Sequence, residues 1–188
     1  MIDHFKKDVD LPALTQDMDA AILKARAKQL AQPVAVKDQN KEKITVLEFL
    51  IMNDVYAVEL HLVEAATRIG DIFPVPFTPR HIPGIIRRRG QTIALVSLER
   101  FFYPTQEGVM DMDFAIIVTV RGKRFALQAA EIKGVFHLKK ELVQTPPDNM
   151  NSARAPYLAG ITRDGLLILN LERIVTANGF GTQMVEEQ

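Results

Sequence analysis

Side chains that could carry covalent chemistry are scarce in this sequence. The 188 residues contain no cysteine, which excludes disulfides, thiolate nucleophiles and thiolate metal sites. Only two serines occur. Ser97 lies in an apolar run expected to be a strand and lacks the glycines of a nucleophile elbow, while Ser152 lies in a polar stretch with no base nearby in the sequence. The sequence therefore offers no nucleophile with a partner.

Metal-binding and phosphate-binding patterns are equally weak. The four histidines are His4, His61, His81 and His137, and none belongs to a short-spaced metal motif. The segment 179–181 lacks the third glycine and the preceding strand of a nucleotide-binding loop. We predict no metal, no cofactor and no enzymatic activity. An enzyme assembled from distant residues stays the least supported alternative.

One charge cluster stands out, the three arginines Arg87, Arg88 and Arg89 before Gly90. In an extended segment side chains alternate, so Arg87 and Arg89 are expected on one side and Arg88 on the other. Two interpretations are open. The arginines keep a turn solvated, or one of them, with Arg89 at the turn as the candidate, forms a forked pair with a carboxylate inside the fold or on a partner.

A nucleic-acid-binding double barrel is a further alternative suggested by these arginines. Lys plus Arg and Asp plus Glu both number 23, and there is no tryptophan, so neither a general basic field nor an aromatic stripe supports it. Our prediction is that nucleic acid is not a partner.

The elements that must position these residues occur twice. Residues 93–100 reappear, displaced by 73 positions, as residues 166–173. Each copy follows a glycine turn, Arg89-Gly90 or Asp164-Gly165, and ends in Leu-Glu-Arg with an apolar pair. This pattern predicts a turn, a central strand and one helical turn that caps a barrel end.

Hairpins precede both copies. From Ile44 apolar residues alternate up to a turn at Asn53-Asp54 and alternate again after it, which indicates a hairpin with one apolar face. Residues 63–69 are expected to continue that sheet, and the same pattern returns around Arg121-Gly122. Exposed edges are avoided if each sheet curls closed, so we predict a mainly β fold of two small barrels with a binding groove between them.

The first 43 residues differ from the rest. Asp10 can cap a helix, and Leu14, Met18 and Ile22 follow at near-helical spacing. Such a helix could dock on the globular part, bind a partner, or form only marginally. No secretory h-region and no apolar run of membrane-spanning length is visible, so we expect a cytoplasmic protein without direct membrane insertion.

The ordered motifs resemble the CheW-like domain family over about residues 44–177. They comprise Phe49 and Tyr56-Ala57-Val58, then Thr78-Pro79, Ile82-Pro83-Gly84-Ile85, Arg89-Gly90 and strand 93–98, with Tyr157–Ile161 and Leu166–Leu171 in the second module. The resemblance implies two intertwined five-stranded, SH3-like barrels. The residue patterns add the N-terminal helix ahead of them and a short C-terminal helix after the last strand. The resemblance also implies a non-catalytic adaptor in bacterial chemosensory arrays.

By the same resemblance, two partners are expected. The surface around Val63, with Glu64 and Ala65, would face the regulatory domain of a CheA-type histidine kinase. A groove near Arg89, Gly90 and Phe114 would bind the cytoplasmic tip of chemoreceptors, the methyl-accepting chemotaxis proteins. Ile86 and Arg87 are further candidate partner-binding residues. Val63 could equally be a core residue. The sequence departs from the family pattern at Ala65, Ala94, Ser97 and Ala130.

The predicted organisation is an N-terminal extension (1–43), a CheW-like domain (44–177) and a tail (178–188). Within the domain we expect subdomains of roughly 44–103 and 113–177 with strand exchange. The predicted function is a chemotaxis adaptor, which membrane-associated receptor arrays could recruit from the cytoplasm. A divergent CheW-like scaffold in a non-chemotaxis two-component pathway is the alternative.

Overall fold

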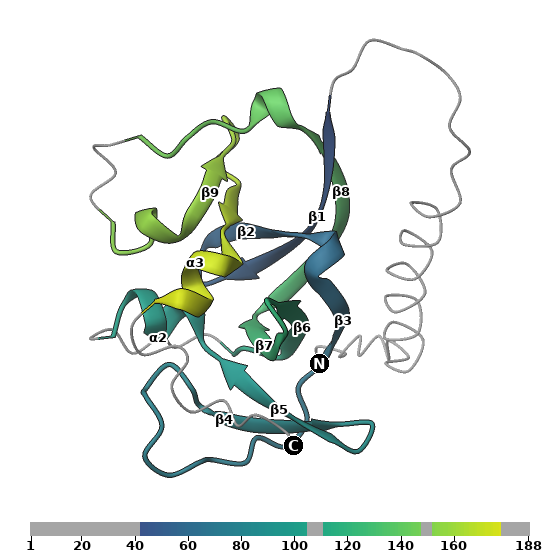
Figure 1. The fold of residues 1–188 in the computed structure, drawn as a ribbon, viewed down its shortest axis with the longest axis vertical. Coiled ribbons are helices and arrows are strands. Elements are labelled where there is room, and N and C mark those ends of the chain that lie inside the picture. Colours follow the sequence, from purple (N-terminus) through teal and green to yellow (C-terminus); the bar gives the residue numbers. More distant parts are fainter. Residues whose placement is uncertain (1–41, 105–110, 148–151, 178–188) are drawn as a thin grey trace, which may run out of the picture.

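A computed structural model describes residues 42–104, 111–147 and 152–177. The predicted N-terminal helix and the tail 178–188 lie outside these residues. The described chain is built mainly of strands, which form two five-stranded sheets with two short α-helices packed beside them (Figure 1). The predicted β class and the short C-terminal helix are therefore confirmed.

The first sheet contains the first two strands and the last three. Its order is β8-β1-β2-β10-β9, with antiparallel pairs except for the parallel contact between β2 and β10. The strands are β1 (Lys43–Ile51), β2 (Asp54–Glu59), β8 (Glu131–Lys139), β9 (Leu158–Ile161) and β10 (Leu167–Leu169).

The second sheet contains the five middle strands. Its order is β3-β6-β7-β5-β4, and its parallel contact joins β5 and β7. The strands are β3 (Val63–Arg68), β4 (Gly84–Arg88), β5 (Gln91–Val96), β6 (Phe114–Val120) and β7 (Lys123–Ala129). In Figure 1 the β4–β5 hairpin lies at the lower end of the molecule and β9 near the upper end.

The two sheets have the same order because the halves of the chain exchange strands. Strands β3, β4 and β5 leave β1 and β2 and pair with β6 and β7, while β8, β9 and β10 return to β1 and β2. The predicted intertwining is confirmed. The expectation that residues 63–69 continue the first sheet is wrong, because the edges of β1 and β2 are taken by β8 and β10.

The hairpin turns contain residues with positive φ, including glycine in the β4–β5 and β6–β7 turns. Arg89 and Gly90 have φ of 49° and 80°, and Arg121 and Gly122 have 51° and 76°, the left-handed pairs that two-residue hairpins favour. Strand β4 ends at Arg88, so the expected shared face of Arg87 and Arg89 is wrong because Arg89 belongs to the turn.

Each repeated strand leads into a short helix, as predicted. Helix α2 (Leu98–Phe102) follows β5 and helix α3 (Leu171–Thr176) follows β10. The Ser97 hydroxyl accepts a hydrogen bond from the Arg100 amide, and the Asn170 side chain accepts one from the Arg173 amide. Ser97 is therefore a helix cap at the end of the strand, and the expectation of a strand residue is wrong.

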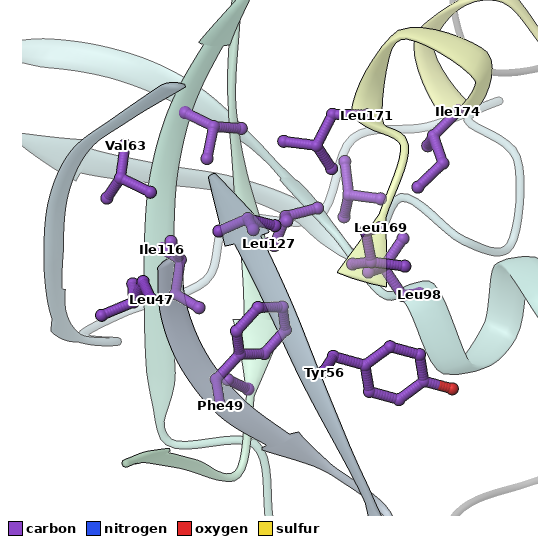
Figure 2. Close-up of a cluster of buried hydrophobic side chains, with 14 of the residues drawn as sticks. Leu47, Phe49, Tyr56, Val63, Leu98, Ile116, Leu127, Leu169, Leu171 and Ile174 are labelled. Carbon is purple, nitrogen blue, oxygen red and sulfur yellow. The ribbon is translucent and has the colours of Figure 1, made fainter. Parts of the chain in front are cut away.

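The largest core cluster joins the two sheets. Figure 2 shows side chains from both sheets and both helices gathered in one group, with the Tyr56 hydroxyl at its edge. Val46 and Ala57 are also fully buried, in a smaller cluster on the other face of the first sheet. The first hairpin is thus buried on both faces, so the predicted single apolar face is wrong.

The repeated Gly-Ile pair marks a close approach of two chain segments in each half. Phe73 forms an antiparallel bridge with Ile85, and Gln144 forms one with Ile161. A Cβ on Gly84 would lie 2.3 Å from the Phe73 carbonyl oxygen, and one on Gly160 would lie 2.2 Å from a Val143 methyl. Glycine is needed at both places so that the crossing segment can pack against the strand.

Short 3-10 turns complete the described chain. They are η1 (Leu60–Leu62), η2 (Lys140–Leu142) and η3 (Ala155–Tyr157). The Tyr157 ring lies 5.0 Å from the Phe101 ring and 5.9 Å from the Phe102 ring, centroid to centroid. These contacts tie α2 to the second half of the chain.

Candidate partner-binding surface

A hollow of about 240 Å³ lies where the end of β3, strand β4 and the segment after β3 meet. We call it the basic hollow, and its lining residues are Thr67, Arg68, Gly70, Asp71, Phe73, Ile86, Arg87 and Arg88. Two of the sequence-predicted site residues, Ile86 and Arg87, therefore line the same depression.

The basic hollow combines positive charge with apolar surface. Three arginines face one aspartate, so an acidic group on a partner would be attracted to it. The Arg68 guanidinium lies 5.4 Å from the centre of the Phe114 ring, within the range of a cation–π contact. This contact connects predicted residue Phe114 to the hollow through a residue that the sequence did not indicate.

The segment that follows β3 is apolar and exposed, yet fixed to the fold. Phe73 is 47% exposed and Phe77 is 99% exposed. The Phe73 amide donates to the Ile85 carbonyl at 2.9 Å, and the Thr78 hydroxyl donates to the Val75 carbonyl at 2.9 Å. The Pro-rich stretch therefore presents aromatic rings to solvent on a backbone that hydrogen bonds hold in place.

Among the predicted partner-binding residues of this region, some are exposed and one is buried. Arg89 and Gly90 form the exposed β4–β5 turn next to the strand that lines the basic hollow. Ile86 is only 4% exposed and packs in a cluster with Ile93 and Leu95. The Ile86 side chain thus supports the hollow from the core.

The predicted kinase-facing residues are also partly internal. Val63 is fully buried in the main core, which agrees with the alternative prediction that it is a core residue. Ala65 packs against the smaller cluster of the second sheet. A register shift between Val63 and Ala65 leaves Glu64 outside the regular ladder with β6.

This bulge directs Glu64 to neighbouring strands of the sheet. Its carboxylate accepts a hydrogen bond from the Thr119 hydroxyl and pairs with the Arg124 Nε at 2.7 Å. Arg124 also donates to the Gln91 side chain. The Glu64 and Arg124 side chains are about one-third exposed, so β3, β6 and β7 present a polar patch centred on Glu64.

The sequence did not indicate a second polar cluster, because its members lie about 100 positions apart. The Arg154 guanidinium pairs with the Asp54 carboxylate and donates to the Tyr56 hydroxyl at 3.0 Å. Burial raises the pKa of Tyr56 to about 12, although the bond from Arg154 acts in the opposite direction. This cluster ties the loop before β9 to the first hairpin.

The described histidines do not gather. The His61 ring lies 3.3 Å from a Glu59 carboxylate oxygen, and the His137 ring shares a hydrogen bond with the Thr45 hydroxyl at 2.9 Å. Within residues 42–104, 111–147 and 152–177, no group of three His, Asp or Glu side chains is placed to hold a metal ion. Over the same ranges no helix is long and apolar enough to cross a membrane.

Two interlaced five-stranded sheets with the same strand order define a double β-barrel class of protein. A family model described as the CheW-like domain matches residues 45–178, which is most of the chain. The chain belongs to the CheW-like domain family. The resemblance predicted from the sequence motifs is thereby confirmed.

Similar proteins agree with this assignment. A curated relative, "Chemotaxis protein CheW" from Treponema pallidum, is 23% identical over 152 residues, which cover 77% of this chain and 88% of the relative. A solved structure, the scaffolding protein TtCheW from Thermoanaerobacter tengcongensis, has a TM-score of 0.64 at 23% identity. That match covers 73% of this chain and 96% of the other. The structural likeness confirms the fold class.

Proposed function

We propose that this chain is a chemotaxis coupling adaptor that works by binding two proteins and has no catalytic step. The predicted partners are the regulatory domain of a CheA-type histidine kinase and the cytoplasmic tip of chemoreceptors. Support comes from membership of the CheW-like family and from the similar proteins named above. The observation that carries the proposal for this chain is the basic hollow beside exposed aromatic rings.

The basic hollow suits a helical partner with acidic and apolar side chains. Interfaces gain most of their affinity from desolvated aromatic and arginine side chains, while rim charges set the register. Here Phe73 and Arg87 line the hollow together, Phe77 supplies a second exposed ring on the same segment, and Arg89 supplies a charge in the adjoining β4–β5 turn. We assign this surface, with Gly90 and the Phe114–Arg68 pair, to the receptor tip.

The polar patch centred on Glu64 is assigned to the kinase domain. Its side chains come from strands of one rigid sheet, and the Glu64–Arg124 pair is exposed enough to exchange partners with a docking surface. The neighbouring Val63 packs in the main core and Ala65 packs against the smaller cluster of the second sheet, so both hold the strand in place. The two partners would then bind to different residues, as an adaptor requires.

The test is to measure binding of each partner to matched variants. The double change Arg87→Ala and Arg89→Ala is expected to weaken binding of a purified receptor tip about tenfold or more, roughly 1.4 kcal/mol. Binding of the kinase domain should change little. Arg163→Ala is the control, because Arg163 is an exposed arginine beside the equivalent Asp164-Gly165 turn of the second half.

Circular dichroism must show that the double variant is folded. Equal receptor affinity for the wild type and a folded double variant would contradict the assignment of the basic hollow. Failure of the wild-type chain to bind either partner would contradict the adaptor function itself.

A further inference from the structure

We propose that a second hollow in the second sheet is a binding site for a guanidinium or ammonium group, with the Glu99 carboxylate as its principal ligand. This Glu99 hollow has a volume of about 370 Å³ and shares only Gly70 with the basic hollow. Its polar lining residues are Ser97, Glu99, Arg100, Asp111, Asp113 and Gln128.

Glu99 carries a buried carboxylate that has no partner in the described chain. The residue is 6% exposed, and its Oε1 atom is buried without a hydrogen bond. Arg100 lines the same hollow, but Glu99 and Arg100 form no ion pair in the part of the chain that the structure describes. Burial of a carboxylate without a hydrogen bond or counter-charge is costly, which indicates that a group from outside completes the site.

The remaining charges of the hollow favour a cation. Asp111 and Asp113 add two carboxylates beside Glu99, and Arg100 supplies one positive charge, so the lining is net negative. The Ser97 hydroxyl accepts from the Arg100 amide at 3.3 Å, and in the described residues it does not donate to the buried Glu99 Oε1 atom. Gln128 contributes a neutral amide that could orient a bound group.

An organic cation fits better than a metal ion. In the part of the chain that the structure describes, no three acidic or histidine side chains converge closely enough to coordinate a metal. The hollow is also far larger than a metal ion. A guanidinium or ammonium group at the end of an alkyl chain could reach Glu99 and leave its stem against the apolar lining of Ile69 and Ile72.

The internal repeat shows what a carboxylate in this position does when an arginine is present. Glu172 is the counterpart of Glu99 in the second Leu-Glu-Arg, and its carboxylate pairs with the Arg121 guanidinium at 3.0 Å. Arg121 begins the β6–β7 turn with φ of 51°, and the matching residue of the β1–β2 turn is Met52, with φ of 54°. The first half therefore has methionine at the position where the second half has the internal cation.

The cation could come from an exposed arginine or lysine of a bound protein, or from a free polyamine. The proposal concerns the shared chemistry and does not depend on the adaptor function. It would survive if neither chemotaxis partner bound, and the adaptor function would survive if this hollow were empty of ligands.

The experiment is an NMR titration of the full chain with three probes: N-acetyl-arginine amide, N-acetyl-lysine amide and spermidine. The side-chain amide signals of Gln128 report on the hollow directly. We expect saturable shifts in the wild type, at least tenfold weaker binding in Glu99→Gln, and unchanged binding in the control Glu172→Gln. Preference for spermidine would identify a free polyamine as the source, and preference for a capped amino acid would identify a protein side chain.

The proposal is overturned if no probe gives saturable shifts, if Glu99→Gln binds as well as the wild type, or if Mg²⁺ alone reproduces all the shifts. If Glu99→Gln does not fold, the double variant Asp111→Asn and Asp113→Asn replaces it, and equal binding by this variant and the wild type would overturn the proposal. Removing the Glu99 charge is expected to leave the melting temperature equal or higher, because no internal partner is lost.

Discussion

Replacing Gly84 by alanine is expected to destabilise the fold by about 3 kcal/mol. The new Cβ would lie 2.3 Å from the Phe73 carbonyl oxygen and 3.0 Å from an Ile72 methyl, and Gly84 has φ of +156°. The backbone must move, which weakens the two 2.9 Å hydrogen bonds between Phe73 and Ile85. Two such bonds at about 1 kcal/mol each, with strain of about 1 kcal/mol or more, give this estimate.

Urea denaturation followed by circular dichroism measures this loss. Gly90→Ala is the matched control, because Gly90 also has positive φ, +80°, but has open space where the Cβ would lie. Its expected cost is about 1 kcal/mol, from the backbone conformation alone. Equal losses in the two variants would refute the argument that the close approach of Phe73 requires glycine. A Gly84→Ala loss below about 1 kcal/mol would refute it as well.

Three further predictions concern the polar contacts of the fold. Because burial raises the pKa of Tyr56 to about 12, the folded protein keeps this proton when the unfolded chain loses it. The contribution of the protonated Tyr56 hydroxyl to the free energy of unfolding is fully present below about pH 10 and falls by about 2 to 3 kcal/mol toward pH 12. Urea titrations of Tyr56→Phe should lack this fall. Arg154→Met leaves Asp54 and Tyr56 without their cation and should cost about 2 kcal/mol, whereas the exposed Arg163→Met should cost little; equal midpoints would contradict this. Ser97→Ala and Asn170→Ala each remove a helix cap and should each cost about 1 kcal/mol, so an effect in only one would argue against equivalent caps.

The repeated features were predictable because they depend on local chemistry. Arg89-Gly90 and Arg121-Gly122 form turns because glycine adopts positive φ without steric cost, and this holds wherever the strands pair. The Leu-Glu-Arg segments form short helices for an equally local reason, because Ser97 and Asn170 cap the first turn of each. Sequence alternation also identified the strands of the first hairpin.

The pairing of strands across the halves was not predictable from local patterns. Alternation in residues 63–69 indicates a strand, but it is the same whether that strand joins β2 or β6. Burial on both faces has the same origin, because Val46 and Ala57 are covered by elements distant in sequence. The turn at Met52 lies one residue before the predicted Asn53-Asp54 because register depends on both strands.

The candidate sites were predictable only in part. Arg87 and the β4–β5 turn were indicated by an unusual run of arginines, whereas Arg68 and Phe73 became visible only when β3 and β4 met at the basic hollow. Burial of Val63 and Ile86 depends on which face of a curled sheet is covered. The Leu-Glu-Arg motif occurs twice, so it does not predict that Glu99 lacks a partner while Glu172 pairs with Arg121.

Simultaneous binding of both partners tests the adaptor function most directly. The kinase regulatory domain is immobilised, the chain is captured on it, and the receptor tip is then added while bound mass is followed by surface plasmon resonance. A further increase in mass, lost in the Arg87→Ala and Arg89→Ala double variant, is the predicted result. Release of the chain by the receptor tip, or no capture by the kinase domain, would contradict it.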